Sequence, residues 1–490
     1  MNTSFMRRTG RRELGIVAIA IALWSYSPLA ARWSLQQIQQ PAPLRPDIPS
    51  DVAGPPTQDA YDTFSWQLFV ALNWPTRDGQ ADRARTIGQA STTPRVWELY
   101  TDPIDLFQSS SLCPDDIPPA DTKRLRMSRD KTGAVDGLDV QAGSQWPLID
   151  QSKNFALVEI LINDVQKRYI TANGLTTPRG IQRHAQTGSI LFPDQSMEVK
   201  AAWRLFPEAT DAQTLARYYT RKAVICVSKE QSRTGQPLRI EGTVGLVGLH
   251  VVYKTRSQRR WIWSTFEHVD NYEISYKPVP GLRPTFSNGG DLIGPNRQPQ
   301  PPPAPGSLYQ WSPTQPTANG FSPTQVARCP NEPRLPSPAN TQWQAALAGV
   351  AGVQNSPWQY YRLNATQWFD SADRLQPRNT DGVAISRNST LETYLLGDQT
   401  IASQVPAIGP VVSAAVVNPA NSTLADTIVA TIVAASTPEK TGPYTWSSCV
   451  VCHQMAMYQY GPNGTQDGVM TDSSFVFRSN LPAGGAVSGK

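Results

Sequence analysis

The sequence predicts an α+β fold, with a central antiparallel β-sheet and accompanying helices, a long Pro-rich strap and a helical C-terminal segment. Three observations support this fold class. Residues 197–205 alternate between apolar and polar side chains, which is typical of a half-buried strand. Two apolar runs, 243–253 and 261–269, flank a polar stretch and predict a hairpin. Residues 278–338 contain 16 Pro, which excludes regular helix and central strand.

The remaining elements of the N-terminal half follow from spacing. Residues 60–74 place large apolar side chains at helical intervals, and Pro75 follows the predicted helix. Residues 93–107 predict a second short element. Residues 154–170 fit either a strand or a helix, and residues 218–227 predict a further strand.

After the strap, residues 340–350 predict a helix, and residues 357–368 are rich in Trp and Tyr. Ser389 and Glu392 have the spacing of a capping box, which predicts a short helix through Leu396. Residues 400–440 are rich in Ala, Val and Thr and are interpreted as an insertion.

These elements divide the chain into four parts. Residues 1–31 are a signal peptide or anchor, and residues 32–277 form an α+β domain. Residues 278–340 form the strap or linker, and residues 341–490 form a C-terminal helical region. The aromatic side chains in 278–338 favour a strap that packs on a folded surface over a free linker.

The N-terminus has the pattern of an export signal. Four Arg between positions 7 and 12 precede an apolar run at 14–24, and Ala30 and Ala31 offer small residues for cleavage. An uncleaved anchor is the alternative. Removing residues 1–31 leaves 40 basic and 38 acidic side chains, a net charge of +2. No basic stripe predicts a nucleic-acid partner.

Near the other end, Cys449, Val450, Val451, Cys452 and His453 read C-x-x-C-H, the attachment signature of c-type haem. At this spacing both thiols can reach the vinyl groups of one porphyrin, and the following imidazole can bind the iron. A zinc site would need a second ligand pair, which the last 37 residues do not contain. A redox dithiol is the remaining alternative.

Three further cysteines, Cys113, Cys226 and Cys329, allow one disulfide and one thiol in an oxidising compartment, with the pairing left open.

The sixth ligand of the iron decides between functions. Met470 is the candidate distal ligand, since Gly-rich turns separate it from His453; packing at the haem edge is the alternative. His268 and Glu267 are candidate acid/base residues for an enzyme, with a structural histidine as the bland alternative. A hairpin centred near residue 257 would give His250 and His268 the same facing.

The motif resembles that of c-type cytochromes. More of the chain resembles large exported mono-haem proteins of Gram-negative bacteria in the cytochrome c family, for which no reaction is established. The similar stretches are residues 65–75 (SWQLFVALNWP), 196–203 (SMEVKAAW), 245–250, 263–271 and 391–395 (LETYL). The resemblance implies covalent haem c and export to the periplasm.

Together these observations predict a periplasmic protein with one covalent haem that transfers single electrons to and from redox partner proteins. The alternative is a haem enzyme of the peroxidase or oxygenase type with an open distal site, motivated by the large amount of protein around one haem. A sensor or binding module is a third interpretation. We expect the upstream domain to cover the haem, with the aromatic side chains of 343–368 as its wall. Any membrane contact is expected only through an uncleaved anchor.

Overall fold

The computed structural model describes residues 43–89, 93–107, 121–126, 147–229, 231–272, 284–288, 299–303, 309–326, 337–350, 353, 356–368, 388–393, 449, 453, 456–459 and 468–477. All of them belong to one compact unit, which spans Ala42–Lys490. The predicted export signal and the segment 400–440 lie outside the described residues. Within the described residues, none of the helices is long and apolar enough to cross a bilayer.

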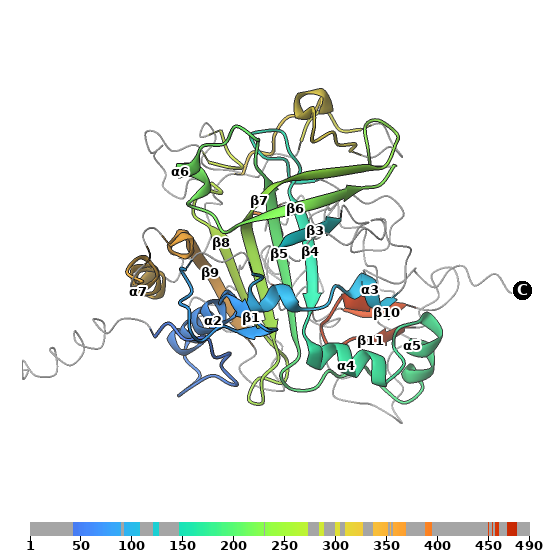
Figure 1. Cartoon of the computed structure of the whole chain (residues 1–490). Coiled ribbons are helices and arrows are strands. Elements are labelled where there is room, and N and C mark those ends of the chain that lie inside the picture. Colours follow the sequence, from blue (N-terminus) through green and yellow to red (C-terminus); the bar gives the residue numbers. More distant parts are fainter. Residues whose placement is uncertain are drawn as a thin grey trace, which may run out of the picture. The chain divides into compact units, whose positions relative to one another are not determined.

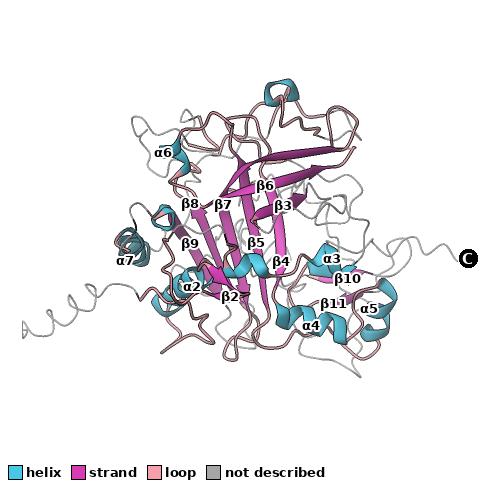
Figure 2. Cartoon of the chain, in the orientation of Figure 1, coloured by secondary structure: helices cyan, strands magenta, loops and turns pink. Residues whose placement is uncertain are grey.

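Helices and strands are mixed along the chain, as Figures 1 and 2 show. The helices are α2 (Gln58–Leu72), η1 (Val96–Leu99), α3 (Pro103–Phe107), α4 (Asp164–Ala172), α5 (Pro178–Ala185), α6 (Ala212–Leu215), η2 (Pro316–Asn319), α7 (Ser337–Ala348) and η3 (Pro357–Tyr360). The strands are β1 (Thr76–Arg77), β2 (Gln80–Ala81), β3 (Thr122–Arg126), β4 (Leu157–Ile162), β5 (Met197–Leu205), β6 (Thr220–Val227), β7 (Leu238–Tyr253), β8 (Ile262–His268), β9 (Tyr361–Trp368), β10 (Met457–Gln459) and β11 (Gly468–Met470).

Seven strands form one sheet around the long strand β7. The path β3-β6-β7-β5-β4 covers one part of it, and β8 and β9 extend it from β7. Strand β5 pairs with one edge of β7, while β6 and β8 lie end to end along the other edge. All pairs are antiparallel except β3–β6, which is parallel. The α+β class is therefore confirmed, and the sheet is mixed where a wholly antiparallel one was expected.

The two faces of the central strands differ in chemistry. One face carries Val199, Leu249, Val251 and Phe266 and belongs to the main apolar cluster, which includes side chains of α2 and α7. The opposite face, here called the polar face, carries buried charged side chains. They are Glu198 and Lys200 on β5, Glu267 on β8 and Arg362 on β9. The strand register places them on the same side as His250 of β7, which is half-buried.

Most predicted elements are confirmed with shifted ends. The strand at 197–205 and the hairpin of β7 and β8 are confirmed, but β5 is buried on both faces where a half-buried strand was expected. The ambiguous stretch 154–170 contains both alternatives, because Asn163 ends β4 and its side chain accepts a hydrogen bond from Gln166 N at the start of α4. The aromatic stretch 357–368 contains strand β9, so the C-terminal region from residue 341 is not purely helical.

The described pieces of the Pro-rich segment pack against the domain, as a strap would. Trp311 is fully buried and its ring stacks on Phe155 at 5.5 Å between centroids. The amide of Thr324 donates to the carbonyl of Ile149 at 2.9 Å. These contacts replace the regular backbone pairing that proline prevents.

Candidate functional site

His453 and Ser473 form the central contact of the C-terminal segment. The Nδ1 atom of His453 lies 2.8 Å from the carbonyl oxygen of Ser473. A carbonyl can only accept, so Nδ1 carries the proton and donates it to this bond. In the neutral ring, the lone pair is then on Nε2, and this is the form in which histidine binds iron.

The carbonyl of Ser473 is presented by an unusual turn. Asp472 and Ser473 have φ values of 52° and 62°, and the amide of Ser474 closes the turn by donating to Thr471 O at 2.9 Å. Two consecutive non-glycine residues in the left-handed region cost on the order of 1–3 kcal/mol each. Contacts from the surrounding structure must therefore hold this turn.

Asp472 makes those contacts. Its carboxylate accepts from Lys254 Nζ at 2.6 Å and from the amide of Phe192 at 2.8 Å, and its backbone carbonyl accepts from Trp261 Nε1 at 2.8 Å. Burial raises the pKa of Asp472 to about 6, and Lys254 opposes that shift, so the group is ionised at neutral pH. The neighbouring Ser474 hydroxyl donates to Glu198 on the polar face.

An apolar cluster surrounds this segment. Trp263 lies 6.2 Å from the His453 ring and Phe475 lies 5.0 Å from it, between centroids. Cys449 is half-buried, is not in a disulfide and packs against the cluster. Figure 1 shows β10 and β11 beside α4 and α5. The cluster contains Phe107, Ile162, Ile170, Leu175, Ile181, Ile190, Phe192, Val252, Trp261, Trp263, Tyr458, Val469, Val476 and Phe477.

The other predicted residues of this site are placed as follows. Cys449 and His453 have helical backbone, while Cys452 lies outside the described residues. Met470 ends β11, is 9% exposed and pairs with Met457 across the ribbon. It stands three residues before Ser473, the acceptor on the Nδ1 side of His453. Cys226 is disulfide-bonded, and Cys113 and Cys329 lie outside the described residues.

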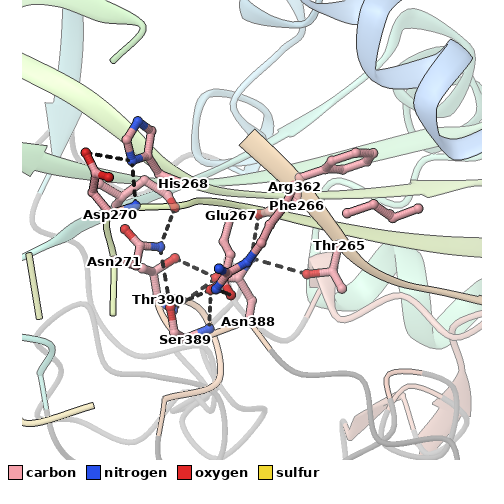
Figure 3. Close-up of polar contacts among 12 residues, drawn as sticks. Thr265, Phe266, Glu267, His268, Asp270, Asn271, Arg362, Asn388, Ser389 and Thr390 are labelled. Atoms are coloured by element: carbon pink, nitrogen blue, oxygen red, sulfur yellow. Dashed lines mark hydrogen bonds and ion pairs between the residues drawn. The ribbon is translucent and has the colours of Figure 1, made fainter. Parts of the chain in front are cut away.

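Glu267 is the centre of a second buried network, drawn in Figure 3. Its carboxylate pairs with Arg362 at 2.8 Å and accepts from the amide and hydroxyl of Ser389 at 3.0 and 2.5 Å. Burial would raise the pKa of Glu267, but Arg362 and Ser389 outweigh it and hold the pKa below its usual value. Glu267 is thus a paired carboxylate that fixes the turn at residues 388–393.

The capping residue of that turn is Asn388, one position before the predicted Ser389. Its side-chain oxygen accepts from the backbone N–H of Thr390 at 3.0 Å, and its backbone N–H donates to the carboxylate of Glu392 at 3.0 Å. Ser389 binds Glu267 instead. Residues 388–393 form turns, and the predicted continuation to Leu396 lies outside the described residues.

His268 is fully buried with both ring nitrogens engaged. Nε2 donates to the carbonyl of Arg217 at 3.0 Å, and Nδ1 accepts from the amide of Asp270 at 3.1 Å. The ring also stacks on Tyr218 at 3.8 Å between centroids. This geometry favours the structural role of His268 over an acid/base role.

The expected common facing of His250 and His268 is wrong. His250 pairs with Thr265 across the hairpin, so the hairpin centre lies between residues 257 and 258. A shift of one residue in register reverses the facing. His250 therefore shares the polar face with Glu267, and its Nε2 lies 2.7 Å from Glu392 Oε1.

We expect His268 to make stability depend on pH. Burial lowers its pKa from 6.5 to about 4, so between these values the unfolded chain binds a proton that the folded chain does not. The contribution is full above pH 6.5 and is lost as the pH falls toward 4, by up to about 3 kcal/mol. Urea unfolding of wild type and His268→Gln at pH 7 and pH 4 measures it, and the variant should lose less stability between the two values. Half-buried His184→Gln is the control and should keep the wild-type dependence; equal losses in all three proteins would contradict the assignment.

Gly248 leaves room for the turn at residues 388–393. A Cβ there would lie 2.0 Å from Thr390 Oγ1 and 2.9 Å from Asn388 Oδ1. We expect Gly248→Ala to lower the free energy of unfolding by about 2 kcal/mol. At Gly349 the nearest atom to an added Cβ is 3.4 Å away, so Gly349→Ala is the control. Equal stability of the two variants in urea would show that the turn moves freely.

The predicted aromatic wall is misplaced. Trp343, Trp358, Tyr361 and Trp368 pack in the main cluster with α2, whereas the C-terminal segment packs with Trp261, Trp263 and Phe192 of the second cluster. Sequence reasoning also missed Asp472 and Lys254. The signal for the pair is weak, because a lone Asp and a lone Lys more than 200 positions apart carry no spacing.

No family model, curated protein or solved structure matches this chain. The resemblance to exported mono-haem proteins therefore stays a prediction that rests on the stretches of sequence quoted above.

Proposed function

We propose that this chain is a periplasmic haem c protein that transfers one electron at a time between redox partner proteins. Cys449 and Cys452 would attach the haem, and His453 would bind its iron. The observation that carries the proposal is the bond from His453 Nδ1 to the Ser473 carbonyl, directly beside a C-x-x-C pair. Iron-binding histidines commonly donate their other ring proton to such an acceptor.

The residues of this site have the chemistry that a covalently attached haem requires. A thiol that is not in a disulfide, an imidazole with its lone pair on Nε2 and an apolar surround are what a covalent haem requires. A haem held there would supply the Fe³⁺/Fe²⁺ couple. The residues of this chain would orient the imidazole, through Ser473, and limit water around it, through Trp263 and Phe475.

Whether Met470 binds the iron distinguishes electron transfer from the alternative of a haem enzyme with an open distal site. As distal ligand it would keep the iron six-coordinate in both oxidation states. Met470 is nearly buried on β11 and pairs with Met457 across the ribbon, and this packed position favours the packing alternative. The acid/base pair proposed for an enzyme has little support, since Glu267 and His268 are both engaged in structural bonds.

The test is the optical spectrum of the purified protein, ferric and ferrous, with and without CO. Electron transfer predicts a low-spin spectrum that CO does not change, and the Met470→Ala variant then shows whether Met470 is the ligand. A high-spin spectrum that CO shifts would favour the enzyme. Absence of covalent haem would contradict both functions and would favour the interpretation of the motif as a redox dithiol.

A further inference from the structure

The turn at Asp472 and Ser473 is held by elements far away in the sequence. Lys254 directly follows β7, Trp261 directly precedes β8, and Phe192 lies in the loop before β5. All three donate hydrogen bonds to Asp472, and these three bonds are here called the clamp. The large sheet therefore fixes the backbone that contacts His453, although His453 itself belongs to the C-terminal segment.

The backbone strain in this turn indicates that these contacts stabilise its conformation. Asp472 has a φ of 52°, a conformation that glycine adopts without penalty and aspartate does not. The side chain of Lys254 is 7% exposed and that of Asp472 is 9% exposed, so the ion pair is screened little by solvent. Without it, the direction of the Ser473 carbonyl would no longer be fixed.

We propose that Asp472 is a positioning residue that sets the reduction potential of the iron, by fixing the Ser473 carbonyl that orients His453. This inference rests on the proposed haem function. A strong bond from Nδ1–H to a carbonyl makes the imidazole a better donor and stabilises the ferric state. Weakening that bond therefore raises the midpoint potential.

The test compares three full-length holoproteins with wild type by redox titration. Asp472→Gly removes the carboxylate and its bonds to Lys254 and Phe192, and it frees the backbone to leave the left-handed conformation, with only the bond from Trp261 to the backbone carbonyl kept. We expect its midpoint potential to rise by about 59 mV, a tenfold change in relative affinity of the imidazole for the two oxidation states. Asp472→Asn keeps an oxygen that can accept from Phe192 and Lys254, so its rise should be smaller. The control is Asp194→Gly. Asp194 is exposed, and its carboxylate makes no hydrogen bond or ion pair within the described part of the chain, so this variant should leave the potential unchanged.

These outcomes separate positioning from charge. Loss of a negative charge alone would raise the potential equally in Asp472→Asn and Asp472→Gly, and equal rises would overturn the proposal. No rise in either variant would also overturn it.

A second measurement does not need haem. In the full chain with Cys449→Ser and Cys452→Ser, nitrogen NMR of the His453 ring should show the proton on Nδ1. Adding Asp472→Gly should give a mixture of both tautomers, and an unchanged Nδ1–H signal would overturn the clamp. If wild type carries no haem, the proposed function fails while this experiment still tests the clamp.

Discussion

Replacing both Cys449 and Cys452 by serine should reduce covalent haem to the background of a haem-stained denaturing gel. The thioether bonds need both thiols, and serine cannot form them. The measurement is made on full-length protein produced in cells that mature c-type haem. Met457→Leu is the matched control, because it conserves volume on the same segment and leaves C-x-x-C-H intact.

The single variants add detail. One remaining thiol can still form one thioether, so Cys449→Ser and Cys452→Ser should each retain less haem than wild type. A double variant that stains as strongly as Met457→Leu would contradict attachment at this motif.

Arg362→Met should destabilise the fold by about 3 to 5 kcal/mol. Glu267 is fully buried and Arg362 is 3% exposed, so losing the cation leaves a carboxylate inside the protein without its ion-pair partner. The bonds from Ser389 remain, but they do not neutralise the charge. The free energy of unfolding in urea at pH 7 measures the effect.

Arg124→Met is the control for this change. Arg124 pairs with Asp105 at 3.4 Å, and the two side chains are 35% and 48% exposed, so this pair should contribute about 0 to 1 kcal/mol. Similar losses in the two variants would mean that Glu267 tolerates the loss of Arg362, by protonation or by exposure to water.

The fold could be predicted where periodicity reports burial. The alternation at 197–205 gave β5 with its observed bounds, and the apolar runs around residue 257 gave the hairpin of β7 and β8. The side of the sheet on which His250 lies was predicted wrongly, because the register of β7 and β8 differs by one residue from the expected one. The loop between these strands includes Trp261 at a φ of 73°, a conformation that the sequence does not reveal. Strand β9 was missed because Trp and Tyr side chains at this spacing fit the buried face of a helix as well as an edge strand.

The site shows the same division. C-x-x-C-H is local, so its residues could be named from spacing alone. Glu267 was named as a candidate base, yet its role depends on Arg362 and Ser389, which lie about a hundred positions further along the chain. The clamp on Asp472 joins Lys254 and Phe192 through tertiary structure only. Long-range pairs of this kind have no periodicity that sequence can reveal.

The most direct test of the account is the intact mass of the purified full-length protein from haem c-maturing cells, followed by peptide mapping. Covalent attachment at this motif predicts a chain heavier by one haem, with the added mass on the peptide that contains Cys449, Cys452 and His453. A chain with the mass of the polypeptide alone would contradict it.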